Sequence, residues 1–568
     1  MGKRSTSTKI WLGLGTCLIL FAGLVWLSHW RAVNTLQEWK ARMIAQGERL
    51  GIDELAPPPA PYDSTASELT AAVNRLWSRS FKPAEFLSMR FSAPGKARLP
   101  WMETNLYSTR ATSTWAQVTA EMASAREDLD AIRAAVGQPA DASVASYRVP
   151  VAGTVVQKRA AAQWLAYETL GRLHAGDLPT AQNDLLALAR LSRLHQNTFT
   201  LLDQMIRVAI AGLGFEVTWA ALQSPGWTEA QLAGLQEEWE WVAFLEKTPR
   251  TIEIERAQIL ELFEDARTNG MRRARAGWGL APRGGRNFKA VFEEHVLDRF
   301  WHVAWAEEDE LFYLQSMQRV LATIRRARSA RSWRSVSGEI RAVDEAIEAR
   351  LNAFDSFRYT LSGLSLFGWQ RAFETVMRQE TQRSLMIAAI ALQRYQLHFG
   401  KLPPDLESLA PEFLTAVPVD YMNGQPLHYG VEPDGSFRLY SVGLDGQDDG
   451  GNPQPVSAWK SYASIFDGRD AVWPRLAPSE KETAGAELQI LPLVQFANAP
   501  VPDVIRVLAR EADLRVRIDP NLKMELQATV TIRLENMTAL DALETILKRN
   551  RLVLVKHANT NLVGITTK

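Results

Sequence analysis

The sequence predicts a multidomain protein with an N-terminal transmembrane helix, a large all-α body and two small α+β modules towards the C-terminus. Three observations support this prediction: an uncharged apolar run near the N-terminus, helical spacing of apolar residues through the middle of the chain, and strand patterns in its last third. The length of 568 residues agrees, because one hydrophobic core seldom grows beyond about 250–300 residues.

The composition excludes several classes of protein. The chain is 46% hydrophobic and 23% charged, as folded proteins are, so a wholly disordered chain is excluded. Its 64 basic and 64 acidic residues lack the basic excess of a nucleic-acid-binding protein. A single cysteine excludes an internal disulfide framework and a thiolate-rich zinc site.

Residues 10–30 form the predicted transmembrane helix. They include no charged residue and would span about 31 Å at 1.5 Å per residue, enough for the hydrocarbon layer. Trp11 and Trp30 lie near the ends, where aromatic rings favour the membrane–water boundary. A basic leader, residues 1–9, favours a cytoplasmic N-terminus and a periplasmic bulk anchored in the bacterial inner membrane. A cleaved signal peptide and a lipoprotein modified at Cys17 are the less favoured alternatives.

A long helical region follows the apolar run. Residues 31–62 are predicted as a juxtamembrane helix that ends in a proline-rich spacer, and residues 63–378 as a helical body. Within this body, residues 161–191 have the pattern of two helices joined by a turn at residues 175–177, and residues 271–287 that of a loop between helices.

Two polar patterns in the body are candidates for function. His295, Asp298 and His302 have a spacing that places them on one helix face, where they would either bind a metal or form a polar surface, the favoured interpretation. An arginine group would either meet lipid headgroups, a phosphorylated ligand or an acidic partner, or form a solvated face, which is again favoured. It comprises Arg325, Arg326, Arg328, Arg331 and Arg334.

The common catalytic motifs are missing from the sequence. It has no phosphate-binding Gly-x-x-x-x-Gly-Lys-Ser/Thr pattern, no Gly-x-Ser-x-Gly and no His-Glu-x-x-His. These absences remove the usual grounds for proposing an enzyme, and a non-enzymatic role is expected.

Residues 379–475 change in character from helix to turns and short strands. A stripe of apolar residues predicts a helix up to Phe399, which Gly400 and the following prolines end. Residues 427–429 and 437–440 are strand candidates, and Asp434-Gly435 between them predicts a hairpin turn.

An acidic loop follows these strands and is the candidate metal site. Asp445, Asp448 and Asp449 alternate with glycines, and carboxylates on a flexible backbone are suited to calcium. An EF-hand is excluded because position twelve is Val456 instead of Glu, so Asp470 is the predicted distant ligand. The alternative is a solvated turn without metal.

This region resembles the C-terminal region of the major pseudopilin of type II secretion systems. Members of that family bind calcium in the loop that corresponds to residues 441–470, which implies Ser441 as a further ligand of Ca²⁺. The chain lacks the family's Gly-Phe-x-x-x-Glu leader, so a borrowed module is expected instead of a filament subunit. The matching residues are Tyr395, Gly400-Lys401-Leu402-Pro403, Pro418-Val419-Asp420, Gly424-Gln425-Pro426-Leu427, Tyr440-Ser441-Val442-Gly443, Asp445-Gly446 and Asp470.

After a linker at residues 476–485, residues 486–568 have the pattern of a βαββαββ domain. Val530, Ile532 and Leu534 alternate with polar residues as in a half-buried strand. A Thr-x-x-Asp capping pattern begins the second helix at Thr538, and the last two strands are predicted to form a hairpin.

This domain resembles the short N-terminal domain that secretins and TonB-dependent receptors share. In those families it docks proteins on the periplasmic side of the outer membrane, which implies protein partners here too. The resemblance rests on Val494-Gln495-Phe496-Ala497-Asn498-Ala499, Val504-Ile505-Arg506-Val507-Leu508-Ala509, Leu514-Arg515-Val516-Arg517-Ile518-Asp519, Val530-Thr531-Ile532, Asn536-Met537-Thr538, Ala542-Leu543 and Ile546-Leu547.

Together these patterns predict a membrane-anchored envelope scaffold or adaptor, a component or accessory of a type II secretion or pilus-like assembly. Its partners would be envelope proteins that bind residues 486–568. One alternative is an envelope signalling or transport receptor. Another is an envelope hydrolase with a site around residues 293–309.

Overall fold

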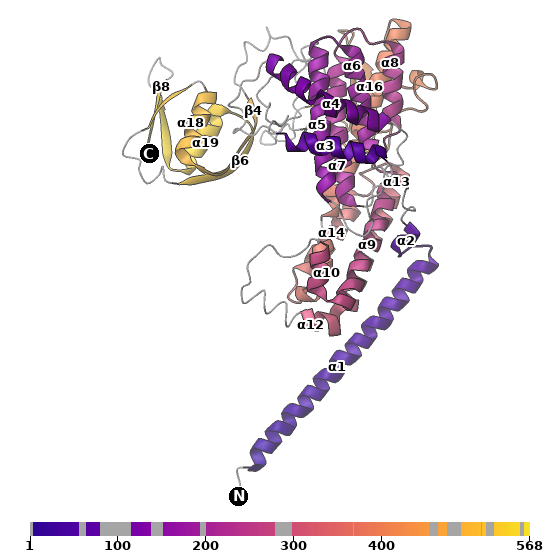
Figure 1. Cartoon of the computed structure of the whole chain (residues 1–568), viewed down its shortest axis with the longest axis vertical. Coiled ribbons are helices and arrows are strands. Elements are labelled where there is room, and N and C mark those ends of the chain that lie inside the picture. The colour runs from indigo at the N-terminus through magenta and orange to yellow at the C-terminus, as the bar shows by residue number, and fades with distance from the viewer. Residues whose placement is uncertain are drawn as a thin grey trace.

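The structure is a computed structural model of the whole chain, and it is mostly helical with small sheets near the C-terminus (Figure 1). It describes residues 4–55, 64–79, 115–137, 152–193, 200–278, 298–366, 368–453, 464–473, 490–512, 514–518, 528–556 and 562–567. The proline-rich spacer from residue 56 and the linker at 476–485 lie outside this description.

The described helices have the following bounds. The α-helices are α1 (Arg4–Ala45), α2 (Ile52–Leu55), α3 (Ser64–Ser78), α4 (Trp115–Gly137), α5 (Ala152–His174), α6 (Leu178–Arg193), α7 (Leu201–Leu222), α8 (Glu229–Glu240), α9 (Thr248–Asn269), α10 (Met271–Gly277), α12 (Asp298–Phe300), α13 (Ala306–Ala330), α14 (Ser337–Leu351), α15 (Thr360–Ser365), α16 (Trp369–Phe399), α18 (Val501–Glu511) and α19 (Ala539–Arg549). A π-helix, η3, covers Trp301–Trp305, and the 3-10 helices are η4 (Ser356–Arg358), η5 (Glu407–Leu409) and η6 (Ile465–Asp467).

The first helix joins two predicted segments. The apolar run at residues 10–30 and most of the predicted juxtamembrane helix form one unbroken helix, α1, of 42 residues. It ends at Ala45 because Gly47 adopts a left-handed backbone with φ of 85°, a common helix terminator. The N–H of Glu48 then donates to the carbonyl of Met43 at 3.0 Å and closes the last turn.

The helical body has one continuous core, and α7 lies inside it. Most side chains of α7 are buried, including Phe215 and Trp219, and α5, α6 and α16 pack against this helix. As predicted, α5 and α6 form a hairpin, whose turn contains Gly176 with φ of 74°. Thr200 caps α7, since its side chain accepts a hydrogen bond from the N–H of Asp203.

The predicted boundary between the body and the pseudopilin-like segment falls inside a helix. α16 runs from Trp369 to Phe399 and crosses residue 379 without a break. Leu406, Leu439 and Trp473 belong to the same buried cluster as the body helices. The described part of residues 379–475 therefore shares a core with the body, whereas the sequence predicted a separate module.

Two strands of this segment, β1 (His428–Val431) and β2 (Phe437–Ser441), match the predicted ones, and a third, β3 (Ala471–Val472), was not predicted. β1 and β2 pair antiparallel across the predicted hairpin turn at Asp434-Gly435. β3 pairs antiparallel with β2, so the acidic loop leaves the sheet at β2 and returns at β3.

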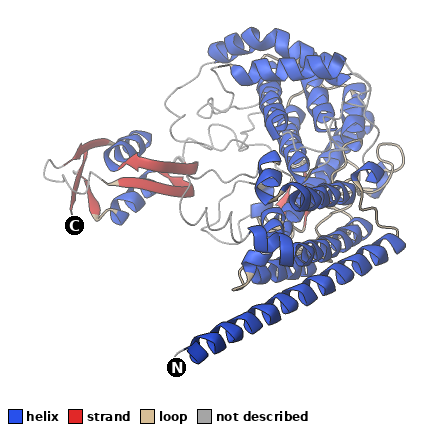
Figure 2. Cartoon of the chain, turned by 60° about the horizontal axis from the view of Figure 1, so that its bottom comes forward, coloured by secondary structure: helices blue, strands red, loops and turns tan. Residues whose placement is uncertain are grey.

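The C-terminal domain has the predicted βαββαββ order. Its strands are β4 (Ile490–Pro500), β5 (Arg515–Ile518), β6 (Thr529–Thr538), β7 (Leu552–Lys556) and β8 (Leu562–Thr567). They form two sheets, an antiparallel β4–β6 pair and a three-stranded β5–β8–β7 sheet, where the sequence predicted one open sheet. α18 and α19 pack against these strands and close a core made of the domain's own residues (Figure 2).

Candidate functional site

The acidic loop is a tightly turned segment between β2 and β3. Gly443, Gly446, Gly450 and Gly451 all have positive φ, which residues with a side chain rarely adopt. At Gly443 a Cβ atom would also lie 2.5 Å from the carbonyl oxygen of Arg469. The glycines that suggested a flexible metal loop are thus needed for the path of the backbone.

Asp470 stabilises the loop from inside. Its side chain is buried, and its carboxylate accepts hydrogen bonds from the N–H groups of Asp449, Gly451 and Asn452 at 2.8–3.3 Å. Burial raises the pKa of this carboxyl, and the hydrogen bonds oppose that effect. Asp470 lies beside Asp449, as the calcium prediction requires, but it binds backbone groups of the loop.

Ser441 faces a different carboxylate, that of Asp420. The Ser441 hydroxyl donates to Asp420 at 2.8 Å, and the N–H groups of Met422 and Val442 donate to the same side chain at 2.8 and 2.9 Å. Asp420 is fully buried, and burial raises its pKa. This contact joins the start of the acidic loop to the turn before β1, and spacing along the chain did not predict it.

The other three aspartates lie on the outer side of the loop. Asp445 accepts a hydrogen bond from the N–H of Gln447 at 3.0 Å. Asp448 accepts from the N–H of Gly450 at 2.9 Å, the contact that contributes most to lowering its pKa, and from the Tyr440 hydroxyl at 3.1 Å. One oxygen of Asp449 lies 3.5 Å from the guanidinium of Arg469.

The five predicted calcium ligands have different surroundings. Ser441 and Asp470 are engaged in buried hydrogen bonds, whereas Asp445, Asp448 and Asp449 keep free lone pairs on the outer side. Within the described residues, no group of three or more His, Cys, Asp and Glu side chains is placed to hold a metal. Calcium binding by the five predicted residues remains a prediction, and Asp445, Asp448 and Asp449 are the ones among them with exposed side chains.

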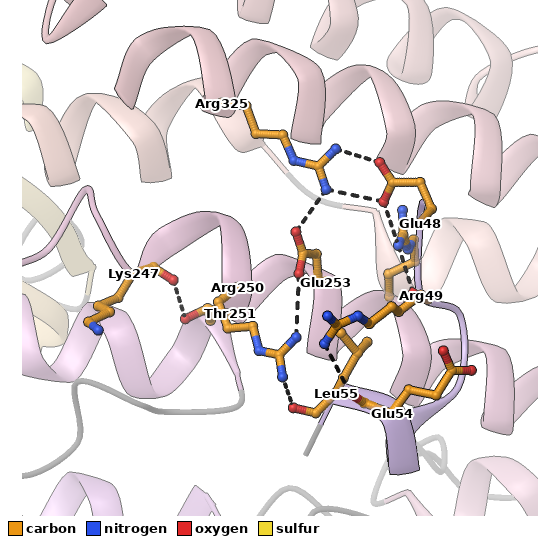
Figure 3. Close-up of polar contacts among 10 residues, drawn as sticks. Glu48, Arg49, Glu54, Leu55, Lys247, Arg250, Thr251, Glu253 and Arg325 are labelled. Carbon is orange, nitrogen blue, oxygen red and sulfur yellow. Dashed lines mark hydrogen bonds and ion pairs between the residues drawn. The ribbon is translucent and has the colours of Figure 1, made fainter. Parts of the chain in front are cut away.

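A second polar site, absent from the sequence predictions, lies where α1 ends. Glu48 is buried, and its carboxylate accepts hydrogen bonds from Arg256 at 3.0 Å and from Gln318 at 2.9 Å. It also accepts one from Arg325 at 3.1 Å (Figure 3). Burial alone would raise the pKa of this carboxyl, but the contacts with Arg325, Gln318 and Arg256 lower it to about 2. The site, which we call the anchor joint, ties the chain after α1 to α9 and α13.

Neighbouring contacts extend the anchor joint. Arg325 also donates to Glu253 at 2.8 Å, and Arg250 donates to the carbonyl of Leu55 at the end of α2 (Figure 3). Beside the joint, Leu36 and Met43 of α1 are buried against α13.

The arginine group predicted as a solvated face is exposed at Arg326, Arg328, Arg331 and Arg334, and half-buried at Arg325. Arg325 lies in the anchor joint, Arg326 pairs with Glu339, and the Arg328 guanidinium lies 3.6 Å from Glu246. Arg331 ends α13 in a left-handed conformation, and Arg334 donates to the carbonyl of Gly446 at 3.0 Å. The solvated-face interpretation therefore agrees with the exposure of these four arginines and is wrong for Arg325, whose guanidinium pairs with the buried Glu48.

The histidine pattern and the proposed hydrolase region are described only in part. His295 lies outside the described residues, Asp298 begins α12 and His302 is exposed on η3. Asp309 is buried and accepts hydrogen bonds from Trp301 and from the N–H groups at the start of α15. In the 271–287 segment, predicted as a loop, residues 271–277 form α10, and those after 278 are outside the description.

Sequence reasoning also missed a buried charged cluster at the start of α7. Burial lowers the pKa of Lys158 to about 8, an effect that nearby Asp203 opposes. Glu255 accepts a hydrogen bond from the N–H of Leu201 at 3.0 Å, and burial raises its pKa to about 7. These residues occur singly on α5, α7 and α9, so no motif marked them. The carboxylates of Asp203 and Glu255 lie at the N-terminus of α7, where negative charge is stabilising.

Comparison with known proteins gives no family for this chain: no family model, no curated protein and no solved structure matches it. Among the described residues, the helix that is long and apolar enough to cross a membrane is α7, of whose apolar window 67% is buried in the core. That criterion does not identify α1, so the N-terminal anchor rests on the sequence and on the surface of α1.

Proposed function

We propose that the protein is a non-enzymatic, membrane-anchored envelope scaffold or adaptor, a component or accessory of a type II secretion or pilus-like assembly. In this proposal α1 crosses the bacterial inner membrane once, its N-terminus is cytoplasmic, and the bulk of the chain is periplasmic. Envelope proteins would dock on the C-terminal domain.

The observation that carries the proposal is the surface of α1. Trp11, Ile19 and Leu24 are 74%, 74% and 66% exposed, although apolar side chains of this size normally avoid water. A lipid environment would cover them at no cost in packing. The same helix continues into the anchor joint, where buried contacts transmit its position to the body.

The C-terminal domain supports docking through its sheet edges. Within the described residues β7 pairs with β8 on one side, and its outer edge bears Val555, which is 46% exposed. Such an edge offers unpaired N–H and C=O groups to a strand of another protein.

Fractionation of cells that express the full chain tests the anchor. We expect the full-length protein to stay in the membrane fraction after alkaline carbonate extraction, which releases peripheral proteins. Recovery as a freely soluble cytosolic protein would refute the proposal.

Site-specific crosslinking in native membranes tests the docking role. A photoreactive residue at Val555 should give adducts with envelope proteins, whereas the same residue at the exposed Lys548 of α19 serves as the control. If crosslinking at both positions stays at the same background level, docking through β7 is contradicted.

We also propose that Ca²⁺ binds the acidic loop by drawing together its outer aspartates, which are not placed as a metal site in the structure. Their support is the presence of three carboxylates within five residues on a backbone already turned by glycines. Calcium should raise the melting temperature of the full chain, and Asp445→Asn should reduce that gain. Asp434→Asn, in the neighbouring hairpin turn, is the matched control. A calcium effect that is absent, or equal in both variants, rejects this site.

A further inference from the structure

We infer that the helical body itself touches the outer surface of the lipid bilayer through an aromatic patch around η3 and η4. The patch comprises Phe300, Val303, Trp305, Phe354 and Phe357. This inference rests on the proposed membrane anchor and deepens it, because it names a second lipid-contacting surface on the part of the chain outside the apolar helix.

The patch is apolar and largely exposed, and the rings of Phe300, Trp305 and Phe357 in it are contiguous. Phe300, Val303 and Phe354 are 42%, 58% and 99% exposed. The Trp305 ring links its two halves, with ring centroids 5.9 Å from Phe300 and 5.1 Å from Phe357. Clusters of this kind on a protein surface usually mark a protein or membrane contact.

The local backbone explains why these side chains point outwards. Trp301 and Ala304 of the π-helix η3 are buried, and the indole N–H of Trp301 donates to Asp309 at 2.8 Å. With that face of η3 held inside, Val303 is directed to the surface. A π-helix has a wider turn than an α-helix, so its side chains point in directions that a regular α-helix would not give them.

The position of the patch along α1 indicates lipid as the ligand. α1 packs against η3 and α13, and the His29 ring nitrogen lies 3.1 Å from Glu307, two residues after Trp305. From residue 10 to His29 a helix rises about 29 Å, close to the thickness of the hydrocarbon layer. The patch therefore lies beside the outer end of the proposed membrane segment, where Trp26 and Trp30 of α1 are also exposed.

Both the residue types and the nearby charge fit the boundary between lipid and water. Aromatic rings concentrate at this depth in membrane proteins. Arg299, next to Phe300, and Arg273 of α10 are exposed and suit anionic headgroups. α10 follows α9, whose Arg267 contacts Glu307 at the start of α13, so these arginines lie at the same end of the body (Figure 1).

Fluorescence quenching in vesicles tests the contact. The full chain is reconstituted in phosphatidylethanolamine and phosphatidylglycerol with an environment-sensitive label at one cysteine. Val303→Cys and, separately, Phe354→Cys are made in a Cys17→Ser background. Leu397→Cys on α16, 53% exposed in the structure, is the matched control. Wild-type Cys17, inside the apolar run, reports on the anchor itself.

We expect a nitroxide near the lipid headgroups to quench the labels at 303 and 354 several-fold more than the label at 397. If water-soluble quencher reaches 303 and 354 as readily as 397, or if they are shielded from both quenchers, as a protein cover would shield them, the inference is overturned. In that case, quenching of the Cys17 label by a nitroxide on the lipid chains would still support the membrane anchor. If the Cys17 label is not quenched by it, the anchor is refuted as well.

Discussion

Replacing Glu48 with glutamine should uncouple α1 from the body. The carboxylate is the common partner of Arg256, whose side chain is 0% exposed, and of Arg325. Glutamine keeps the shape but loses the charge, so the buried Arg256 guanidinium loses its counter-ion. Arg325 keeps its contact with Glu253 at 2.8 Å.

The expected loss of stability follows from that unpaired charge. Removing one partner of a buried ion pair typically costs about 3–5 kcal/mol, because the remaining charge stays buried without compensation. Glutamine can still accept a hydrogen bond, so we expect the lower end, about 3 kcal/mol. With a urea dependence of about 3 kcal/mol per M, the unfolding midpoint of the body should fall by about 1 M.

Urea unfolding of the full chain in detergent, followed by far-ultraviolet circular dichroism, measures this midpoint. Glu54→Gln removes the same charge from an exposed position of α2 and is the control. Proteolysis between residues 46 and 51 should also accelerate in Glu48→Gln, since this segment loses its attachment. If both variants unfold at the same midpoint, the anchor joint does not hold α1 as we argue.

Three further outcomes follow from the structure. Because the pKa of Glu48 is lowered to about 2, its stabilising contribution is complete above pH 4.5 and is lost as the pH falls towards 2; Glu48→Gln should lack that part of the acid dependence in unfolding experiments. Burial raises the pKa of Asp309 to about 6, so wild-type stability should fall by up to about 3 kcal/mol as the pH rises from 4 through 6, and Asp309→Asn should not show this fall. In α7, a Cβ at Gly214 would lie 2.6 Å from the Trp239 ring while one at Gly212 meets nothing within 4 Å, so Gly214→Ala should lower the thermal midpoint and Gly212→Ala should raise or preserve it.

Local patterns in the sequence predicted local structure well. The alternation around Val530 and Ile532 became β6, the Asp434-Gly435 pair became a hairpin turn, and the turn at residues 175–177 joins α5 to α6. Each of these features depends on residues within a few positions of one another, where side-chain periodicity and turn chemistry decide the backbone.

Predictions that needed distant partners were less successful. The hydrogen bond of Ser441 to Asp420, 21 residues earlier, has no signal in the local sequence. Arg325 was assigned to a solvated face but pairs with Glu48, 277 residues away. No spacing rule connects such positions, because the approach of two side chains depends on how whole helices pack.

The sequence by itself determined the long apolar N-terminal segment, the predominance of helix and the order of elements in the C-terminal domain, since these follow from hydrophobic periodicity within each segment. Only the tertiary structure decided that α16 joins the strands after it to the body core, that Asp470 binds the backbone of its own loop, and that aromatic side chains from η3 and η4 meet beside α1. These outcomes depend on which buried surfaces and charges find one another in three dimensions, and burial converts weak local preferences into specific contacts.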